Sequence, residues 1–336
     1  MQTNIAFSAE VLKIDPAAEV RIIQDAVREI VFRQFHRKGA VVGLSGGIDS
    51  SVTAALCVGA LGNSRVFGLM MPESDSAEES TYLGAMVATH FGIETAIENI
   101  TPTLASMGCY ERRNQAIQKV IPQYTPEWKF KIVLPNMLLS DGFAVYSVVA
   151  NGPDGKTVKV RLTSEAYLEI VAATNFKQRT RKTLEYYHAD RLQYAVAGTP
   201  NRLEFDQGFF VKLGDGAADF KPIAHLYKSQ VYQIAEYLGV PEEIRRRPPT
   251  TDTYSLQQSQ EEFYFSVPLA KMDLCLYGKN HGFSPEEVGV VIGLAPDQVA
   301  RVYVQIDAKR KMANYLHSRP MLVEDIFDLG SSSVRR

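Results

Sequence analysis

The chain has 336 residues, of which 46% are hydrophobic, and its 36 basic and 38 acidic residues give a formal net charge of −2. This composition is typical of a globular chain that can bury a full core, and the near-neutral charge gives no global electrostatic reason to expect a nucleic-acid or membrane partner. Because there is no signal-peptide pattern at the start and no apolar run of about 18 residues, we expect a cytoplasmic protein.

The N-terminal part predicts helices that alternate with short apolar strands. Helical spacing of apolar residues predicts a helix over residues 16–35, and an acidic capping segment predicts another at about 76–91. Apolar runs predict strands at 40–42 and 66–71, and the short run 94–100 predicts a third strand. Because this alternation requires parallel βαβ units, the predicted fold class is α/β, with a doubly wound, Rossmann-like parallel sheet.

A segment at about 105–173 interrupts this rhythm and is predicted to be an insertion. Alternating residues at 144–150 and 157–162 flank a turn at 151–155 that is rich in Gly, Pro and Asp, which predicts an antiparallel hairpin. Beyond the insertion we expect a helix at about 175–193, followed by a strand that ends in a turn at Thr199.

The C-terminal part predicts two helices, at 284–292 and 296–316, joined by a short turn. The basic residues 309–311 would allow a DNA-binding helix-turn-helix, but the neutral overall charge favours a helical subdomain packed on the rest of the chain. The predicted organisation is a main domain at 1–255, this subdomain at 256–328 and a disordered tail at 329–336.

The loop at 43–51 combines a strand end, a glycine turn and a helix start. Its backbone N–H groups and helix dipole converge where a phosphate could sit. A Walker A loop has Lys-Ser/Thr after its last glycine, whereas this loop has Ile48-Asp49. Asp49 would repel a nucleotide unless a divalent cation lay between them, which predicts Mg²⁺ on the pyrophosphate part of ATP. An ordinary strand-to-helix turn with Ser45 as N-cap is the alternative interpretation.

The loop is followed downstream by four further sequence blocks, and together they resemble the NAD synthetase family of the ATP pyrophosphatase (adenine nucleotide α-hydrolase-like) superfamily. The resemblance covers roughly residues 15–100 and 175–256, more weakly the C-terminal helices, and not 105–173. The blocks that carry it are Asn175-Phe176-Lys177-Gln178-Arg179, Gly198-Thr199-Pro200-Asn201-Arg202-Leu203-Glu204, Gly208-Phe209-Phe210-Val211-Lys212-Leu213-Gly214-Asp215-Gly216 and Pro249-Thr250-Thr251-Asp252.

The resemblance implies a reaction in two steps. The nicotinate carboxylate of deamido-NAD attacks the α-phosphate of ATP and releases pyrophosphate, and ammonia then attacks the acyl carbon to give NAD and AMP. Such chemistry needs charge neutralisation more than a nucleophilic side chain, because the substrates supply both nucleophiles.

The resemblance also implies roles for individual residues. ATP would be held by Ser45, Gly46, Gly47, Asp49, Ser50, Ser51, Arg179, Thr199, Lys228 and Thr250. Deamido-NAD would be held by Asn175, Tyr186, Phe209, Lys212, Asp215 and Asp219. The implied Mg²⁺ ligands are Asp49 and Glu204. The implied catalytic residues are Asp49, Lys228 and Asp215.

Several of these residues have simpler interpretations. Glu204 could be a solvated acid at a helix end, and Lys228 a surface charge at a helix start. Tyr186 and Phe209 could be ordinary core residues, and Asp215 a turn residue between glycines.

The ammonia source and the assembly are also expectations from the resemblance. Glutamine-dependent relatives carry a nitrilase-like domain before the synthetase part, whereas the phosphate loop here begins at Ser45. We therefore expect free ammonia, or a separate ammonia-supplying subunit, and a homodimer. Three alternative functions are an adenylating ligase for another carboxylate, a non-catalytic nucleotide-binding module, and a tRNA-modifying enzyme. The last is disfavoured by the absence of paired cysteines and of a basic excess.

Overall fold

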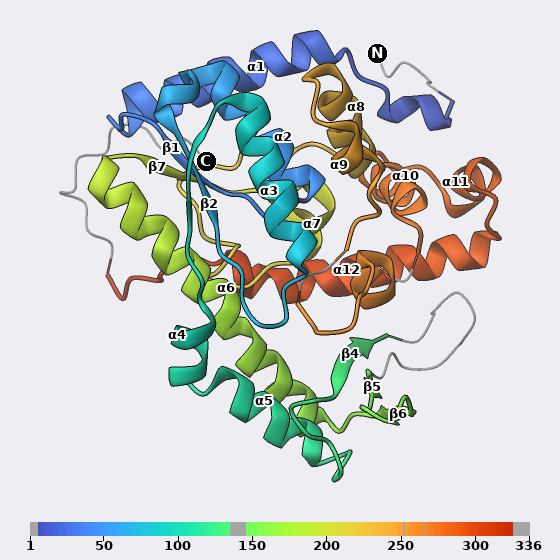
Figure 1. The fold of residues 1–336 in the computed structure, drawn as a ribbon. Helices are drawn as coiled ribbons and strands as arrows, with labels where there is room; N and C mark the ends of the chain where they lie inside the picture. The colour runs from blue at the N-terminus through green and yellow to red at the C-terminus, as the bar shows by residue number, and fades with distance from the viewer. Residues whose placement is uncertain (1–5, 135–145, 251–252, 266, 325–336) are drawn as a thin grey trace.

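The computed structural model of the chain describes residues 6–134, 146–250, 253–265 and 267–324. Its centre is a parallel sheet of four strands in the order β3-β2-β1-β7 (Figure 1). The strands are β1 (Ala40–Gly43), β2 (Val66–Met70), β3 (Glu94–Ile97) and β7 (Ala195–Ala197). The chain adds β2 and β3 on one side of β1 and β7 on the other, which creates a topological switch point at the end of β1.

Helices cover both faces of this sheet, which confirms the predicted doubly wound α/β fold. Alternate residues of a strand point to opposite faces, so Val42 packs in the core of one face and Val41 in that of the other. The first face carries α1 (Pro16–Arg28), α2 (Ile48–Leu61), α3 (Glu78–Phe91) and α8 (Lys228–Tyr237). The second face carries α4 (Thr101–Ser106) and α6 (Ser164–Leu192).

The predicted insertion forms a layer of its own at the bottom of Figure 1. Here α5 (Cys109–Gln118) packs against an antiparallel sheet of β4 (Lys129–Val133), β5 (Ser147–Asn151) and β6 (Thr157–Arg161). We call these four elements the insertion module. The predicted hairpin is confirmed as β5 and β6, although residues 144–145 lie outside the described residues. The sequence patterns did not predict α5 or β4.

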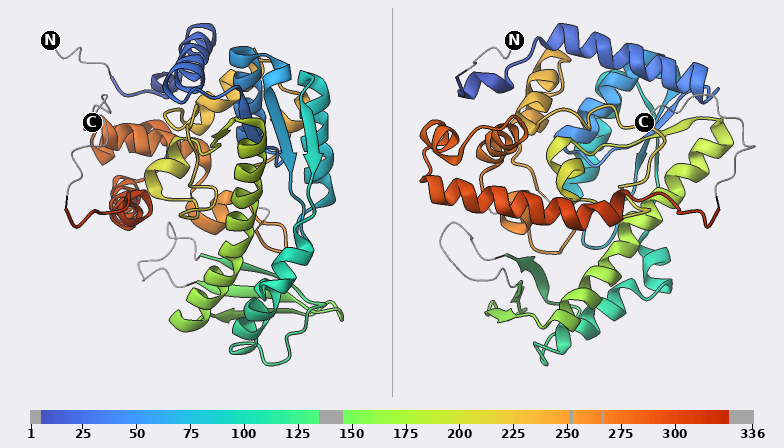
Figure 2. Two further views of the ribbon diagram at one scale, coloured as in Figure 1. Left: turned by 90° about the vertical axis from the view of Figure 1, so that its left-hand side faces the viewer. Right: turned by 180° about the vertical axis from the view of Figure 1, so that it is seen from behind.

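The helix α6 joins the insertion module to the sheet and runs the length of both (Figure 2). It begins at Ser164, so the predicted start near Asn175 is wrong. The reason is a local cap, because the Thr163 side chain accepts a hydrogen bond from the Ala166 N–H at 3.1 Å. Two other predicted ends also differ. The strand predicted to reach residue 100 ends at Ile97, and α1 passes at Arg28 into a wider helical turn, Glu29–Gln34.

The C-terminal helices form a second core together with residues from the N-terminal segment and the main domain. Leu12, Leu203 and Tyr227 pack into the same cluster as α10–α12. The predicted helices correspond to α11 (Pro285–Ile292) and α12 (Pro296–His317), and α10 (Leu269–Asn280) was not predicted. The remaining short helices are η1 (Ala9–Leu12), η3 (Asn63–Arg65), α7 (Arg202–Gln207), α9 (Glu242–Arg246) and η4 (Glu261–Phe265).

Two of the three basic residues that suggested DNA binding face the protein. Lys309 Nζ donates to the Tyr264 carbonyl at 2.7 Å, and the Arg310 guanidinium contacts both carboxylate oxygens of Asp206 at 2.5 and 2.8 Å. The Lys309 contact lies within the predicted subdomain, and the Arg310 contact joins it to the main domain, which supports a subdomain packed on the rest of the chain. Among the described residues, every helix is too short or too polar to cross a membrane.

Candidate active site

A cavity of about 450 Å³ opens beyond the carboxyl ends of β1, β2 and β7. Its lining includes the loop after β1, the segment after β2, one side of α6, the residues around α7 and the segment that precedes η4. Ligands of open α/β sheets bind at this position, beside the switch point.

The loop between β1 and α2 has the geometry of a phosphate cradle. Gly46 has a φ of +75°, and a Cβ at this position would lie 2.6 Å from the Ser80 carbonyl oxygen, so glycine is required here. The hydroxyls of Ser45 and Ser50 lie 3.1 Å apart at the start of α2. Because α2 has 14 residues and begins at this loop, its free N–H groups and dipole favour an anion at this point.

Five of the six phosphate-loop residues in the prediction line the cavity: Ser45, Gly46, Gly47, Asp49 and Ser50. Ser51 is not among the lining residues. It is fully buried, and its hydroxyl donates to the Gly47 carbonyl at 2.8 Å, so the structure places it in the first turn of α2.

Asp49 and Lys228 form an ion pair at the floor of the cavity. The other carboxylate oxygen of Asp49 accepts a hydrogen bond from the Asn201 amide at 3.1 Å. Burial alone would lower the pKa of Lys228, but the charges of Asp49 and Glu204 outweigh this effect and raise it. Lys228 is only 3% exposed, so it is a buried and charged group rather than a surface lysine.

Glu204 lies at the first turn of α7 and lines the same cavity. Its carboxylate accepts from the Asn201 N–H at 3.1 Å and from the Gln260 amide at 2.9 Å. Burial and the neighbouring Asp49 charge raise the pKa of Glu204 to about 8. This repulsion between two carboxyl groups is what a hard divalent cation between them would relieve.

The position of Lys228 depends on a residue that the sequence patterns did not identify. Asp273, on α10, is fully buried, and its carboxylate accepts from the Lys228 and Ser229 N–H groups at 3.1 and 2.7 Å. It therefore caps the start of α8 from a distant part of the chain. No local sequence signal marks such a cap, because the two segments are 45 residues apart.

Five further residues in the prediction also line the cavity: Asn175, Thr199, Phe209, Asp215 and Thr250. Asp215 Oδ1 accepts from the Val211 N–H at 2.8 Å, and burial raises the pKa of its carboxyl group. Asp215 is therefore a turn residue that also lines the cavity.

Four other residues in the prediction lie outside the cavity lining. The exposed Arg179 donates to the Lys212 carbonyl at 3.3 Å, and the Lys212 ammonium donates to the Tyr315 carbonyl near the end of α12 at 2.8 Å. The Tyr186 hydroxyl donates to Asp219 at 3.1 Å, and Asp219 also accepts from the Val196 N–H at 2.7 Å. Within this chain, these contacts hold the four residues away from the cavity.

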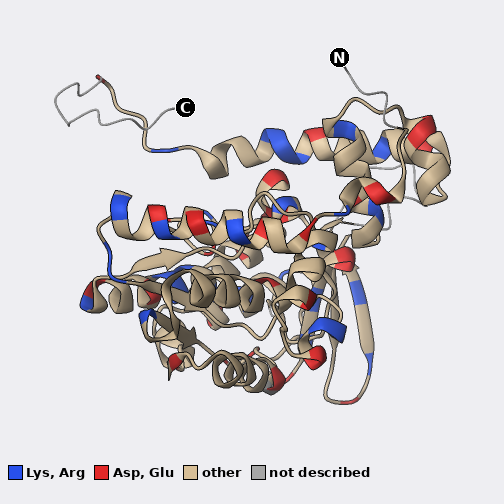
Figure 3. Ribbon diagram, turned by 90° about the horizontal axis from the view of Figure 1, so that it is seen from above, with Lys and Arg blue, Asp and Glu red and all other residues tan. Residues whose placement is uncertain are grey.

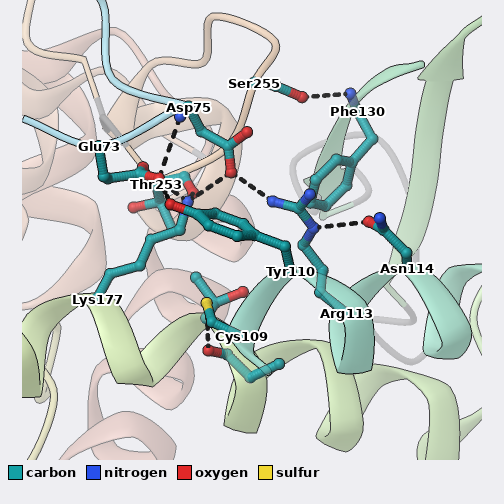
Figure 4. A network of polar contacts seen from close by, with 12 residues as sticks. Glu73, Asp75, Cys109, Tyr110, Arg113, Asn114, Phe130, Lys177, Thr253 and Ser255 are labelled. Carbon is teal, nitrogen blue, oxygen red and sulfur yellow. Dashed lines mark hydrogen bonds and ion pairs between the residues drawn. The ribbon is translucent and has the colours of Figure 1, made fainter. Parts of the chain in front are cut away.

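A buried ion network borders the cavity on the side of the insertion module (Figure 4). The ammonium of Lys177 lies 2.9 Å from Glu73 and 2.7 Å from Asp75, and it donates to the Thr253 carbonyl at 2.9 Å. Asp75 also pairs with Arg113 of α5. Burial alone would raise the pKa of Asp75, but the two cations outweigh it and lower the pKa. Lys177 belongs to the family-like block at 175–179, which was the only sequence signal for it.

A second buried pair lines the cavity beside β1. Lys182 Nζ lies 2.5 Å from a carboxylate oxygen of Glu185, and both residues are on α6. A Cβ added at Gly43 would lie 2.9 Å from the other carboxylate oxygen of Glu185, so this carboxylate lies close against the end of β1. Neither residue was identified in the sequence.

Residues 19–122 and 152–313 match the family model for NAD synthase. A relative named NH(3)-dependent NAD(+) synthetase, from Rhizobium meliloti, is 58% identical over 328 residues, which is 98% of this chain and 98% of the relative. A relative of the same name from Thermotoga maritima is 34% identical and covers 83% of this chain and 91% of its own length.

The solved structure of NH3-dependent NAD synthetase from Campylobacter jejuni has the same fold. Its TM-score is 0.61 at 22% identity, over 93% of this chain and 100% of that chain. NMN synthetase from Francisella tularensis gives a TM-score of 0.58 at 19% identity, over 92% of this chain and 99% of that chain.

The match to the family model corrects the predicted extent of the resemblance. The unmatched segment between its two parts is 123–151, which is shorter than the predicted 105–173. The Rhizobium meliloti relative aligns over nearly the whole chain, so this segment is shared with it for the most part. Because the family model matches most of the chain, and a curated relative is 58% identical over nearly its full length, the chain belongs to the NAD synthase family.

Proposed function

We propose that this chain is an ammonia-dependent NAD synthetase, which amidates deamido-NAD with ATP and ammonia and releases AMP and pyrophosphate. The observation that carries the proposal is the group of Asp49, Lys228 and Glu204 at the floor of a glycine-loop phosphate cradle. Binding alone would not require a buried lysine paired to an acid beside the phosphates. The names of the relatives at 58% identity support the same reaction.

The residues of the cavity suit an adenylation. The cradle donors and the Ser45 and Ser50 hydroxyls would orient the phosphates of ATP. The buried Lys228 ammonium would neutralise the charge that develops when pyrophosphate leaves. The substrates supply the nucleophiles, so the protein contributes position and charge.

Mg²⁺ fits the donor set of this site. Asp49 and Glu204 are hard oxygen ligands that line the same cavity, and burial together with the Asp49 charge raises the pKa of Glu204 even though Lys228 lies beside the pair. We infer that these two residues would hold the ion, which would neutralise phosphate oxygens when bound.

The partners of this chain follow from the same reading. ATP, deamido-NAD and ammonia would be its substrates, with free ammonia or a separate subunit as the ammonia source. We expect a homodimer, with α1 and α6 as candidate contacts, and both present large exposed apolar side chains, such as Ile22 and Leu168.

Figure 3 shows basic and acidic residues interspersed along the helices seen from above, which fits a small-molecule enzyme better than a nucleic-acid-binding protein.

The test is incubation with ATP, MgCl₂, ammonium chloride and deamido-NAD. We expect NAD, AMP and pyrophosphate in equal amounts, measured by chromatography. AMP formed only with a different carboxylate would favour the alternative adenylating ligase, and no AMP with any carboxylate would favour the binding module.

Asp49→Asn should abolish pyrophosphate release while the circular dichroism spectrum stays native. Unchanged activity would remove Asp49 from the site.

A further inference from the structure

Asn201 lies in the turn between β7 and α7, beside the two carboxyl groups that would hold Mg²⁺. It is 1% exposed and is not among the residues that line the cavity, although Glu204 is. The strand β7 pairs with β1 in parallel, with Ala197 opposite Val42, so the turn after β7 lies next to the loop that carries Asp49. Asn201 is therefore placed to act on the site through its neighbours.

Each polar atom of the Asn201 side chain has a partner. The side-chain oxygen accepts from the N–H groups of Leu203 and Glu204 at 2.9 and 3.2 Å, which caps the first turn of α7. The side-chain nitrogen donates to one carboxylate oxygen of Asp49 at 3.1 Å, although the two residues are 152 positions apart. The backbone N–H of Asn201 donates to the Glu204 carboxylate at 3.1 Å. One residue thus contacts both carboxyl groups of the predicted metal site.

The Asn201 amide restricts the orientation of the Asp49 carboxylate. Lys228 pairs with one oxygen of Asp49, and Asn201 donates to the other. Contacts on both oxygens oppose rotation of the carboxylate, which a single ion pair would not do. Because each carboxylate oxygen can accept about two contacts, both oxygens keep capacity for a cation.

An amide side chain suits this position better than the other common helix caps. It accepts through its oxygen, donates through its nitrogen and adds no charge. An aspartate would cap α7 but would place a third carboxylate beside Asp49 and Glu204. A serine would also cap α7, but its single short hydroxyl would not supply the donor to Asp49 as well. The contacts of Asn201 therefore indicate a role beyond capping.

We propose that Asn201 is a positioning residue, which holds the Asp49 carboxylate in the orientation in which Asp49 and Glu204 bind a divalent cation together. This inference rests on the Mg²⁺ site of the proposed function, and it does not depend on which carboxylate acceptor the enzyme uses. Groups that hydrogen-bond to metal ligands typically change metal affinity by about 10–100-fold when they are removed.

The test uses α,β-methylene ATP, an analogue that cannot release pyrophosphate, so it requires no turnover. Calorimetry measures its dissociation constant in EDTA and in saturating MgCl₂, on wild type and on Asn201→Ser. Serine keeps a cap acceptor for α7 but removes the amide donor to Asp49. The ratio of the EDTA constant to the MgCl₂ constant measures how much the cation adds to nucleotide binding. We expect this ratio to fall by about tenfold in the variant.

A defect of the cap or of packing would weaken binding in both conditions and leave the ratio as in wild type, which would overturn the proposal. Ser284→Ala is the matched control for capping. The Ser284 side chain accepts from the Glu287 N–H at 3.3 Å at the start of α11, and neither residue lines the cavity. This control should lower the urea midpoint and keep the wild-type ratio. If Asn201→Ser does not fold, Asn201→Gly provides the same comparison, because glycine is also tolerated at an N-cap.

Failure of this proposal can be told apart from failure of the proposed function. A wild-type ratio of one would mean that the cation adds nothing to nucleotide binding, and would overturn the positioning role. If wild type shows a ratio above one but forms no NAD from deamido-NAD, the proposed function fails, and the ratio in Asn201→Ser still decides the role of Asn201.

Discussion

The carboxyl group of Glu204 has the clearest energetic consequence of any single residue in the site. Its pKa is about 8 in the folded chain, because it is buried and faces Asp49. An unfolded glutamate titrates near 4.5. Between these two values the folded chain holds a proton that the unfolded chain has released, so the free energy of unfolding decreases as the pH rises.

Glu204→Gln should remove the decrease in the free energy of unfolding that the Glu204 carboxyl group causes as the pH rises. We expect the stability of the variant relative to wild type to increase by roughly 1–4 kcal/mol between pH 5 and pH 8.5, without nucleotide or Mg²⁺. Urea denaturation at several pH values measures the difference. A difference that does not change with pH would show that Glu204 is ionised in the folded chain at the lower pH. Activity should be lost in the same variant, because glutamine is a poor ligand for Mg²⁺.

Asp273 of α10 caps the start of α8, and this cap positions Lys228 in the candidate site. Asp273→Asn leaves one amide oxygen where two carboxylate oxygens now accept from Lys228 and Ser229. We expect a loss of about 1–3 kcal/mol in the free energy of unfolding, and a slower turnover at saturating substrate because Lys228 is the first residue of the helix. Asp307→Asn on α12 is the control, since its carboxylate is 63% exposed and pairs only with Lys279 among the contacts described. Equal effects of the two substitutions would contradict the capping role.

Elements with a local signal could be predicted from the sequence, and those held by distant contacts could not. The strands β1, β2 and β7 are short apolar runs, and the phosphate loop is marked by its glycines and Asp49. The antiparallel strand β4 pairs with β5, which begins 14 residues after β4 ends, and no local pattern specifies that pairing. The prediction placed the start of this helix near residue 175 and did not use the cap at Thr163, so it missed the first turns of α6.

The candidate site shows the same division. Asp49 could be identified from the phosphate loop, and Glu204 and Lys228 from the segment 175–256 that carries the resemblance, and the structure brings all three together. Tyr186 and Asp219 lie in the same segment, yet the structure pairs them with each other outside the cavity. The sequence specifies which residues are candidates, and tertiary packing decides which of them line the cavity.

At the scale of the whole molecule, ion pairs and a hydrogen bond of Lys177 connect three parts of the chain. Its ammonium contacts Glu73 and Asp75 after β2 and the Thr253 carbonyl before η4, and Asp75 continues the network to Arg113 in the insertion module. Lys177 and Thr253 line the cavity, and Glu73 and Asp75 lie between two lining residues, Pro72 and Ser76. The relative position of the insertion module and the phosphate cradle therefore depends on a buried charge.

Lys177→Met should cost about 3–5 kcal/mol of unfolding free energy, because it leaves two buried carboxylates without their shared cation. The matched control is Lys119→Met on α5, which also removes a lysine paired with two carboxylates, Glu165 and Glu169. The Lys119 side chain is 43% exposed whereas that of Lys177 is 2% exposed, so solvent screening should limit the control to about 1 kcal/mol or less. Urea denaturation of both variants measures the contrast. Equal costs would mean that the carboxylates reach water when Lys177 is removed, and that the network does not fix the geometry between the insertion module and the cradle.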